Sequence, residues 1–126
     1  MKFTISSASL ASATQTVTNI VSDRPTMAIL GGILITTGDG EVTFRTTDMT
    51  TSVSATMSAD IDEPGEAVVS ARMMRGIAKS LPDAVVEIDA SDDVARLTCQ
   101  KSKWSQRTLG VIDFPTWDDF DVVSEA

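Results

Sequence analysis

The stretch Ser70–Asp83, SARMMRGIAKSLPD, decides how the second half of the chain folds. Its apolar residues recur at helical spacing until a proline stops the pattern, which predicts a helix over Ala71–Leu81. At 100° per residue, its three cations fall within roughly 60° of one another and the apolar residues cover the opposite side. We therefore expect one cationic stripe and one apolar stripe, formed by Arg72, Arg75 and Lys79 and by Met73, Met74, Ile77, Ala78 and Leu81.

The order of elements around this helix occurs twice along the chain. Both halves are predicted to run strand–helix–strand–strand–strand, although few residues are identical between them. Eight strands and two helices predict an α+β fold in which the helices lie side by side against the sheets. The first half comprises a strand at Lys2–Ile5, a helix from Ser6, Ser7 or Ser9 to about Val21, and strands at Gly32–Thr37, Glu41–Arg45 and Thr51–Met57; the second comprises Glu66–Ser70, the helix, Val85–Asp89, Val94–Cys99 and Trp104–Leu109.

The segments between and after these elements are predicted to be turns or connections. Gly38–Gly40 and Thr46–Asp48 have the residue types of turns, and Asp60–Gly65 reads as an exposed connection. The length favours a single domain, which we expect to span residues 1–115. Residues 116–126 are predicted to form an acidic linker or tail, since the chain from Val111 onward carries acidic residues and no cation.

Composition narrows the possible functions. The chain has 18 acidic residues against 10 basic ones and no histidine, so it lacks the usual general base and the commonest metal ligand. The single cysteine, Cys99, cannot form an internal disulfide. No signal peptide or membrane-spanning stretch is evident, which predicts a cytoplasmic protein. We expect no catalytic residue, metal or cofactor; a serine- or carboxylate-dependent hydrolase is the distant alternative, and Lys101-Ser102-Lys103 offers no oxyanion hole for it.

The cationic stripe allows two interpretations. It is either a solvated helix face or a surface that faces phosphates. The second gains support from the first helix, whose exposed face offers Ser12, Gln15, Thr16 and Asn19 and no carboxylate that would repel a polyanion. Such a surface would contact the nucleic-acid backbone without reading sequence, and three cations would bind it weakly and in a salt-sensitive way.

Several segments, in the same order along more than a hundred residues, are similar to a known family. The chain resembles the first domain of the bacterial DNA polymerase III beta subunit family, the sliding clamps. The matching segments are MKFTI at Met1–Ile5, RPTMAIL-GGILI at Arg24–Ile35, DGEVTFRTTDM at Asp39–Met49, EPGEAVVSARMMRGIAKSLPD at Glu63–Asp83, KSKW at Lys101–Trp104 and TLGVIDFP at Thr108–Pro115.

This resemblance implies a DNA-clamp fold with two helices on two four-stranded antiparallel sheets. It implies a processivity factor for DNA replication, an accessory subunit of a DNA-directed DNA polymerase holoenzyme with no catalytic site of its own. Two three-domain subunits would close head-to-tail into a ring around double-stranded DNA, and polymerase and clamp loader would bind later domains. The alternative is a stand-alone clamp-like interaction domain that forms no ring, which the length of the gene would distinguish.

The resemblance also implies roles for individual residues. DNA contacts are expected at Arg24, which follows the first helix, at Arg72 and Lys79, at Gln15, and at Arg75, whose position is less regularly basic in the family. Two features depart from the family pattern: the first helix lacks basic residues, and Ala28 replaces a common proline. The subunit interface is expected at the last strand and on one side of the second helix, through Lys101, Lys103, Trp104, Met73 and Ile77.

The lysines of the last strand also have a purely structural explanation. Charged side chains on an edge strand discourage pairing with other chains. Subunit contact and edge protection are compatible roles for Lys101 and Lys103.

Overall fold

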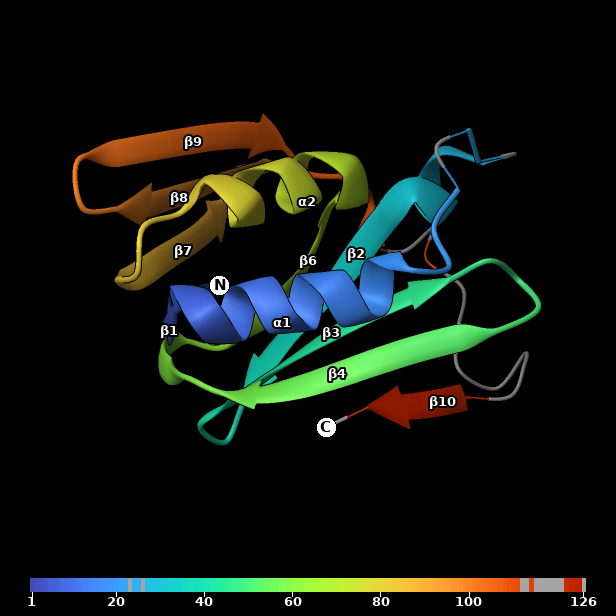
Figure 1. Ribbon diagram of the computed structural model, residues 1–126, viewed down its shortest axis with the longest axis horizontal. Coiled ribbons are helices and arrows are strands. Elements are labelled where there is room, and N and C mark those ends of the chain that lie inside the picture. Colours follow the sequence, from blue (N-terminus) through green and yellow to red (C-terminus); the bar gives the residue numbers. More distant parts are fainter. Residues whose placement is uncertain (23, 26, 112–113, 115–121, 126) are drawn as a thin grey trace.

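Two helices and two sheets make up the fold of the computed structural model (Figure 1). The structure describes residues 1–22, 24–25, 27–111, 114 and 122–125. The first sheet has the strand order β5-β1-β7-β8-β9, and the second has β10-β4-β3-β2-β6. The elements are β1 (Lys2–Ser6), α1 (Ser7–Thr18), the 3-10 turn η1 (Ala28–Gly31), β2 (Gly32–Gly38), β3 (Glu41–Thr47), β4 (Ser52–Ser58), β5 (Asp60–Glu63), β6 (Gly65–Ser70), α2 (Ala71–Ser80), β7 (Val85–Ser91), β8 (Val94–Cys99), β9 (Ser102–Arg107) and β10 (Val122–Glu125).

The predicted fold class, two helices packed on two antiparallel sheets, is confirmed. Each sheet nevertheless has five strands instead of four. Asp60–Glu63, predicted as part of a connection, pairs antiparallel with β1 as β5. Its side chains are mostly exposed, so the strand is held by backbone pairing. Its sequence therefore shows no alternation of apolar and polar residues that would predict a strand. The other additional strand, β10, lies in the predicted acidic tail and runs parallel to β4.

The two halves exchange their first strands. β1 does not join the strands that follow it; it pairs with β7 of the second half, with Phe3 opposite Ile88. Reciprocally, β6 pairs with β2 of the first half, with Val69 opposite Ile33. Each sheet therefore contains strands from both halves, which ties the repeats into one unit.

Both helices start directly at the end of a strand and are capped by a serine. The hydroxyl of Ser6 accepts from the backbone N–H of Ser9, and that of Ser70 accepts from the backbone N–H of Met73. This satisfies one of the otherwise unpaired donors of each first turn. α1 ends at Thr18, three residues before the predicted end.

The β3–β4 turn begins two residues later than predicted. β3 continues to Thr47, so the turn lies at Asp48 and beyond. There the Asp48 carboxylate accepts the N–H groups of Thr50 and Thr51. An aspartate that binds its own backbone two residues on is a common turn device, and here it sets where the hairpin reverses.

One main core lies between the helices and the sheets, with α1 across β3 and β4 and beside α2 (Figure 1). Phe3, Leu10, Phe44 and Met74 are among its fully buried side chains. Cys99 is also buried there.

A second cluster covers the outer face of the second sheet. Leu34 belongs to it and points away from the main core, which its neighbours Ile33 and Ile35 enter. The buried residues of this cluster are Ile29, Leu30, Leu34, Val68 and Phe114.

In the described part of the chain, no helix is long and apolar enough to cross a membrane. The predicted domain boundary at residue 115 lies outside the described residues, as do residues 116–121 of the predicted tail.

Candidate nucleic-acid interface

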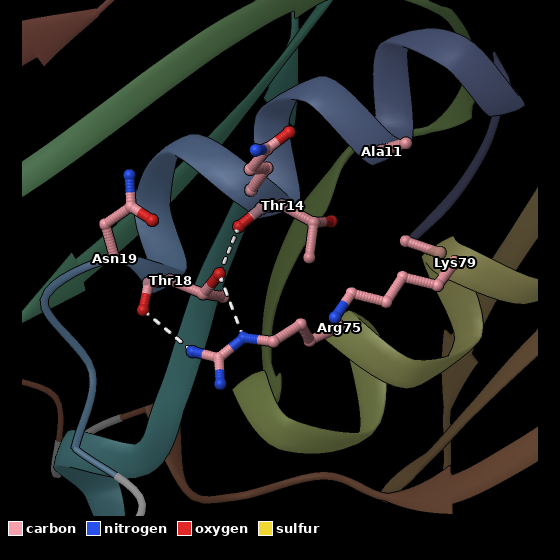
Figure 2. Close-up of a pocket in the computed structure, with 8 residues that line it drawn as sticks. Ala11, Thr14, Thr18, Asn19, Arg75 and Lys79 are labelled. Carbon is pink, nitrogen blue, oxygen red and sulfur yellow. Dashed lines mark hydrogen bonds between the residues drawn. The ribbon is translucent and has the colours of Figure 1, made fainter.

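A groove with a mixed polar and apolar lining lies between the two helices (Figure 2). Its volume is about 370 Å³. One wall comes from the second half of α1 and the following turn, and the other from the middle and end of α2. We call this the interhelical groove; its lining comprises Ala11, Thr14, Gln15, Thr18 and Asn19 on one side and Arg75, Ala78 and Lys79 on the other.

A second depression lies on the other side of the α2 cations. This cationic hollow is lined by Arg24, Arg72, Arg75, Gly76 and Lys79. Arg24, Arg72 and Lys79 are exposed, whereas Arg75 is half-buried. Gly76 adds no side chain and leaves the hollow open between the cations. The five side chains expected to contact DNA, including Gln15, thus line two depressions that share Arg75 and Lys79.

The charge of this surface is of one sign. Among the described residues, no aspartate or glutamate lines either the interhelical groove or the cationic hollow. The cations lie on adjacent turns of α2, and Arg24 joins them from the segment after α1. Clustered cations on a surface of a chain with net charge -8 give a local positive potential where a polyanion can bind.

Arg75 joins the two helices and is not a simple surface cation. Its Nη2 donates to the backbone carbonyl of Thr18 at 2.8 Å, and its Nε donates to the Thr18 hydroxyl at 3.3 Å (Figure 2). That hydroxyl in turn donates to the carbonyl of Thr14 at 2.7 Å. α1 has no basic residue in its last turn, so a cation from α2 satisfies and neutralises its C-terminal end.

The last strand of the second half lies at an edge of the first sheet, as its predicted roles require. Lys101 and Lys103 are exposed, and Trp104 is half-buried against the main core, opposite Leu97. Gln106 of the same strand is buried, and its Oε1 accepts the N–H of Ser70 at 3.0 Å. This contact ties the edge strand β9 to the start of α2.

The two α2 residues expected at the subunit interface lie in different environments. Met73 is 46% exposed, so it belongs to the surface and not to the apolar stripe predicted for it. Ile77 is 5% exposed and packs in the main core, so its side chain is not available to a second subunit. The buried residues of α2 are Ala71, Met74 and Ile77. The buried side of the helix is therefore narrower than the apolar stripe predicted from the sequence.

Comparison with known proteins identifies the family. A family model described as "DNA polymerase III beta subunit, N-terminal domain" matches residues 1–118. The chain belongs to this family.

Individual relatives agree with the family match. A beta sliding clamp from Micrococcus luteus is 34% identical over 115 residues, covering 91% of this chain and 37% of the relative. The beta sliding clamp of Escherichia coli K12 is 31% identical over 122 residues, which cover 95% of this chain and 33% of the relative. The structure of Caulobacter crescentus pol III beta superposes with a TM-score of 0.89 at 31% identity. The match covers 92% of this chain and 32% of the Caulobacter chain. The chain thus spans about a third of the length of these sliding clamps.

Sequence reasoning missed the threonines of the site. Thr18 and Thr14 complete the wall of the interhelical groove, and Thr18 holds Arg75, yet both are simply part of an uncharged helix in the sequence. The only sequence signal for these threonines was the polar composition of α1, which indicated a polar helix surface but not which residues line the groove. The contact between Arg75 and Thr18 joins residues 57 positions apart, which no local pattern predicts.

Proposed function

We propose that this chain is the N-terminal domain of a ring-shaped sliding clamp that encircles duplex DNA and tethers the replicative polymerase. α1 and α2 would face the DNA, and the acidic remainder of the chain would discourage DNA from binding elsewhere. The observation that carries the proposal is the cationic hollow, which gathers Arg24, Arg72 and Lys79 without a carboxylate among the described residues that line it. Backbone phosphates are the groups that such a surface would contact, without reading the bases.

The remaining roles follow from the same proposal. The domain would act as a non-catalytic accessory subunit, and polymerase and clamp loader would bind later domains of the subunit. A head-to-tail homodimer would use the β9 edge, where Lys101 and Lys103 are exposed, together with Trp104 and the exposed Met73. Three cations are a small share of such a ring, so this chain alone should hold DNA weakly.

The DNA face is tested in a full-length clamp that carries this domain. Arg24→Ala with Arg72→Ala and Lys79→Ala should shorten retention on circular duplex DNA. The slope of log K against log salt should fall in magnitude by about 0.9 for each phosphate contact removed. Arg96→Ala, which removes an exposed cation from β8, is the control and should change neither quantity. Unchanged retention and salt slope in the triple variant would contradict the proposed DNA face.

The subunit contact is tested separately. Lys101→Glu with Lys103→Glu should shift the full-length protein from dimer to monomer in sedimentation velocity, because the resemblance to sliding clamps implies an acidic partner surface that the reversed charges would repel. A dimer that persists in the double variant would leave edge protection as the role of these lysines.

A further inference from the structure

The hydroxyl of Thr14 is a buried polar group with no partner inside the described part of the protein. The residue is 1% exposed, it lines the interhelical groove, and its Oγ1 makes no hydrogen bond. Two other threonines of α1 donate to the carbonyl four residues earlier, Thr16 to Ser12 and Thr18 to Thr14. A buried hydroxyl without a partner is rare and unfavourable, which points to a group that comes from outside the chain.

The wall opposite Thr14 carries positive charge in a fixed geometry. Arg75 is held by its two hydrogen bonds to Thr18, so its guanidinium is already ordered before any ligand binds. Lys79 lies one helical turn further along α2 and also lines the groove (Figure 2). A pre-ordered cation loses little side-chain entropy on binding, which favours an anion at this position.

The rest of the lining consists of neutral groups, several of which can donate hydrogen bonds. Gln15 and Asn19 carry amides, and no acidic residue lies among the described residues that line the groove. The groove has a volume of about 370 Å³, well above the roughly 30 Å³ that one water molecule occupies in the liquid. The groove is therefore large enough to hold a group bigger than a water molecule.

We propose that the interhelical groove binds one phosphate group, separately from the cationic hollow beside it. Lys79 and Arg75 would supply the charge, the amide of Gln15 would donate to a phosphate oxygen, and the Thr14 hydroxyl would gain its missing partner; Asn19 lies at the other end of the groove from Lys79 (Figure 2). The inference rests on the proposed function in one respect, since a backbone phosphate of duplex DNA is one source of this group. Free phosphate is the other source, and the chemistry of the site is the same for both.

The test is an NMR titration of the 126-residue chain with inorganic phosphate, with sodium chloride of equal ionic strength as the reference. Saturable shifts are expected at the amides of Thr14, Thr18 and Asn19. Thr14→Val keeps the side-chain shape and removes the hydroxyl; it should weaken phosphate binding by about tenfold, the effect of one hydrogen bond to a charged group. Lys79→Gln should weaken it further, whereas Lys103→Gln, on β9, should leave it unchanged.

Thr14→Ser separates packing from hydrogen bonding because it keeps the hydroxyl and removes only the methyl group. It should bind phosphate like the unchanged chain. Shifts that do not saturate, or that are equal in Thr14→Val, would mean an adventitious ion only and would overturn the inference. So would a Thr14→Val chain that melts at a higher temperature and binds phosphate as before, since the hydroxyl would then be simply unpaired.

A second titration, with a short duplex at low ionic strength, distinguishes this inference from the proposed function. If Arg72→Ala weakens duplex binding and Thr14→Val has no effect on duplex or phosphate, the DNA face stands and the phosphate site is wrong. If phosphate shifts the groove residues and the duplex shifts neither helix, the site takes free phosphate and the proposed DNA face fails. Duplex shifts at Thr14, Thr18 and Asn19 that disappear in Thr14→Val would support both.

Discussion

The two halves of the chain share a framework and differ in charge. In each, a strand leads directly into a helix that a serine caps, and the residue four positions after the cap is buried, Leu10 in α1 and Met74 in α2. α1 has no charged residue, whereas α2 carries three cations and has Lys79 in its last turn. Caps and buried positions thus set the architecture, and the exposed face of each helix is left to vary with function.

The difference also produces a contact between the halves. α1 lacks a basic residue near its end, and Arg75 of α2 occupies that place by binding Thr18. The halves are therefore complementary, because one helix supplies a charge that the other lacks. The following predictions test how far the equivalence of the two helices extends.

The largest effect is expected from the matched core positions. Leu10→Ala and Met74→Ala should each lower the free energy of unfolding by about 2–5 kcal/mol, because both side chains are at most 1% exposed and share the main core. Urea denaturation of the two variants measures this, with Gln15→Ala and Arg72→Ala, on the exposed faces of the two helices, as controls. A loss below about 1 kcal/mol for either core variant would show that its helix does not share the core equally.

Next in size is the loss of the bridge between the helices. Arg75→Ala should lower the free energy of unfolding by about 1–3 kcal/mol, because the carbonyl and hydroxyl of the buried Thr18 lose a charged donor. The free energy of unfolding of Arg75→Lys should lie between those of Arg75→Ala and the unchanged chain, since an ammonium retains the charge and lacks the planar pair of donors. Chemical denaturation of both variants is compared with Arg72→Ala, which lies on the exposed face of the same helix. Equal stability of Arg75→Ala and Arg72→Ala would exclude a bridging role.

A smaller and symmetrical effect is expected at the caps. Ser6→Ala and Ser70→Ala should each cost about 1 kcal/mol of stability, because each removes a hydroxyl that accepts a first-turn N–H. Ser70→Asp should keep most of the stability, as a carboxylate also caps and favours a helix N-terminus. Thermal unfolding of the three variants measures these stability changes. Markedly unequal losses in the two alanine variants would show that the halves depend differently on their caps.

The smallest effect has the opposite sign. Gly76→Ala should raise the free energy of unfolding by about 1 kcal/mol, because alanine favours helix and a methyl group there would meet no atom within 4 Å. Ser12, also six residues after its cap serine, is the matched position in α1, and Ser12→Ala should give a smaller gain. Urea denaturation would refute this expectation if Gly76→Ala were no more stable than the unchanged chain.

Sequence patterns predicted most elements because their signals are local. Alternation and turn residues placed β8 at its observed bounds, Val94–Cys99. Apolar periodicity marked both helices, with Ser6 among three possible caps of α1 and no cap predicted for α2. The edge strand β5 was missed because it exposes most of its side chains and so carries no apolar alternation, whereas the edge strands β6 and β9 were predicted. Helix periodicity also assigned Met73 to the apolar stripe, although only packing decides how wide a buried stripe is.

The sequence by itself determined the repeated order of elements and the cationic stripe of α2, because these depend on residues close together along the chain. Only the tertiary structure decided that β1 and β6 exchange sheets, that Arg24 joins the α2 cations, and that Arg75 binds the end of α1. Those choices depend on backbone pairing and packing between residues far apart in sequence, where many partners satisfy the same local pattern and the shared core selects one.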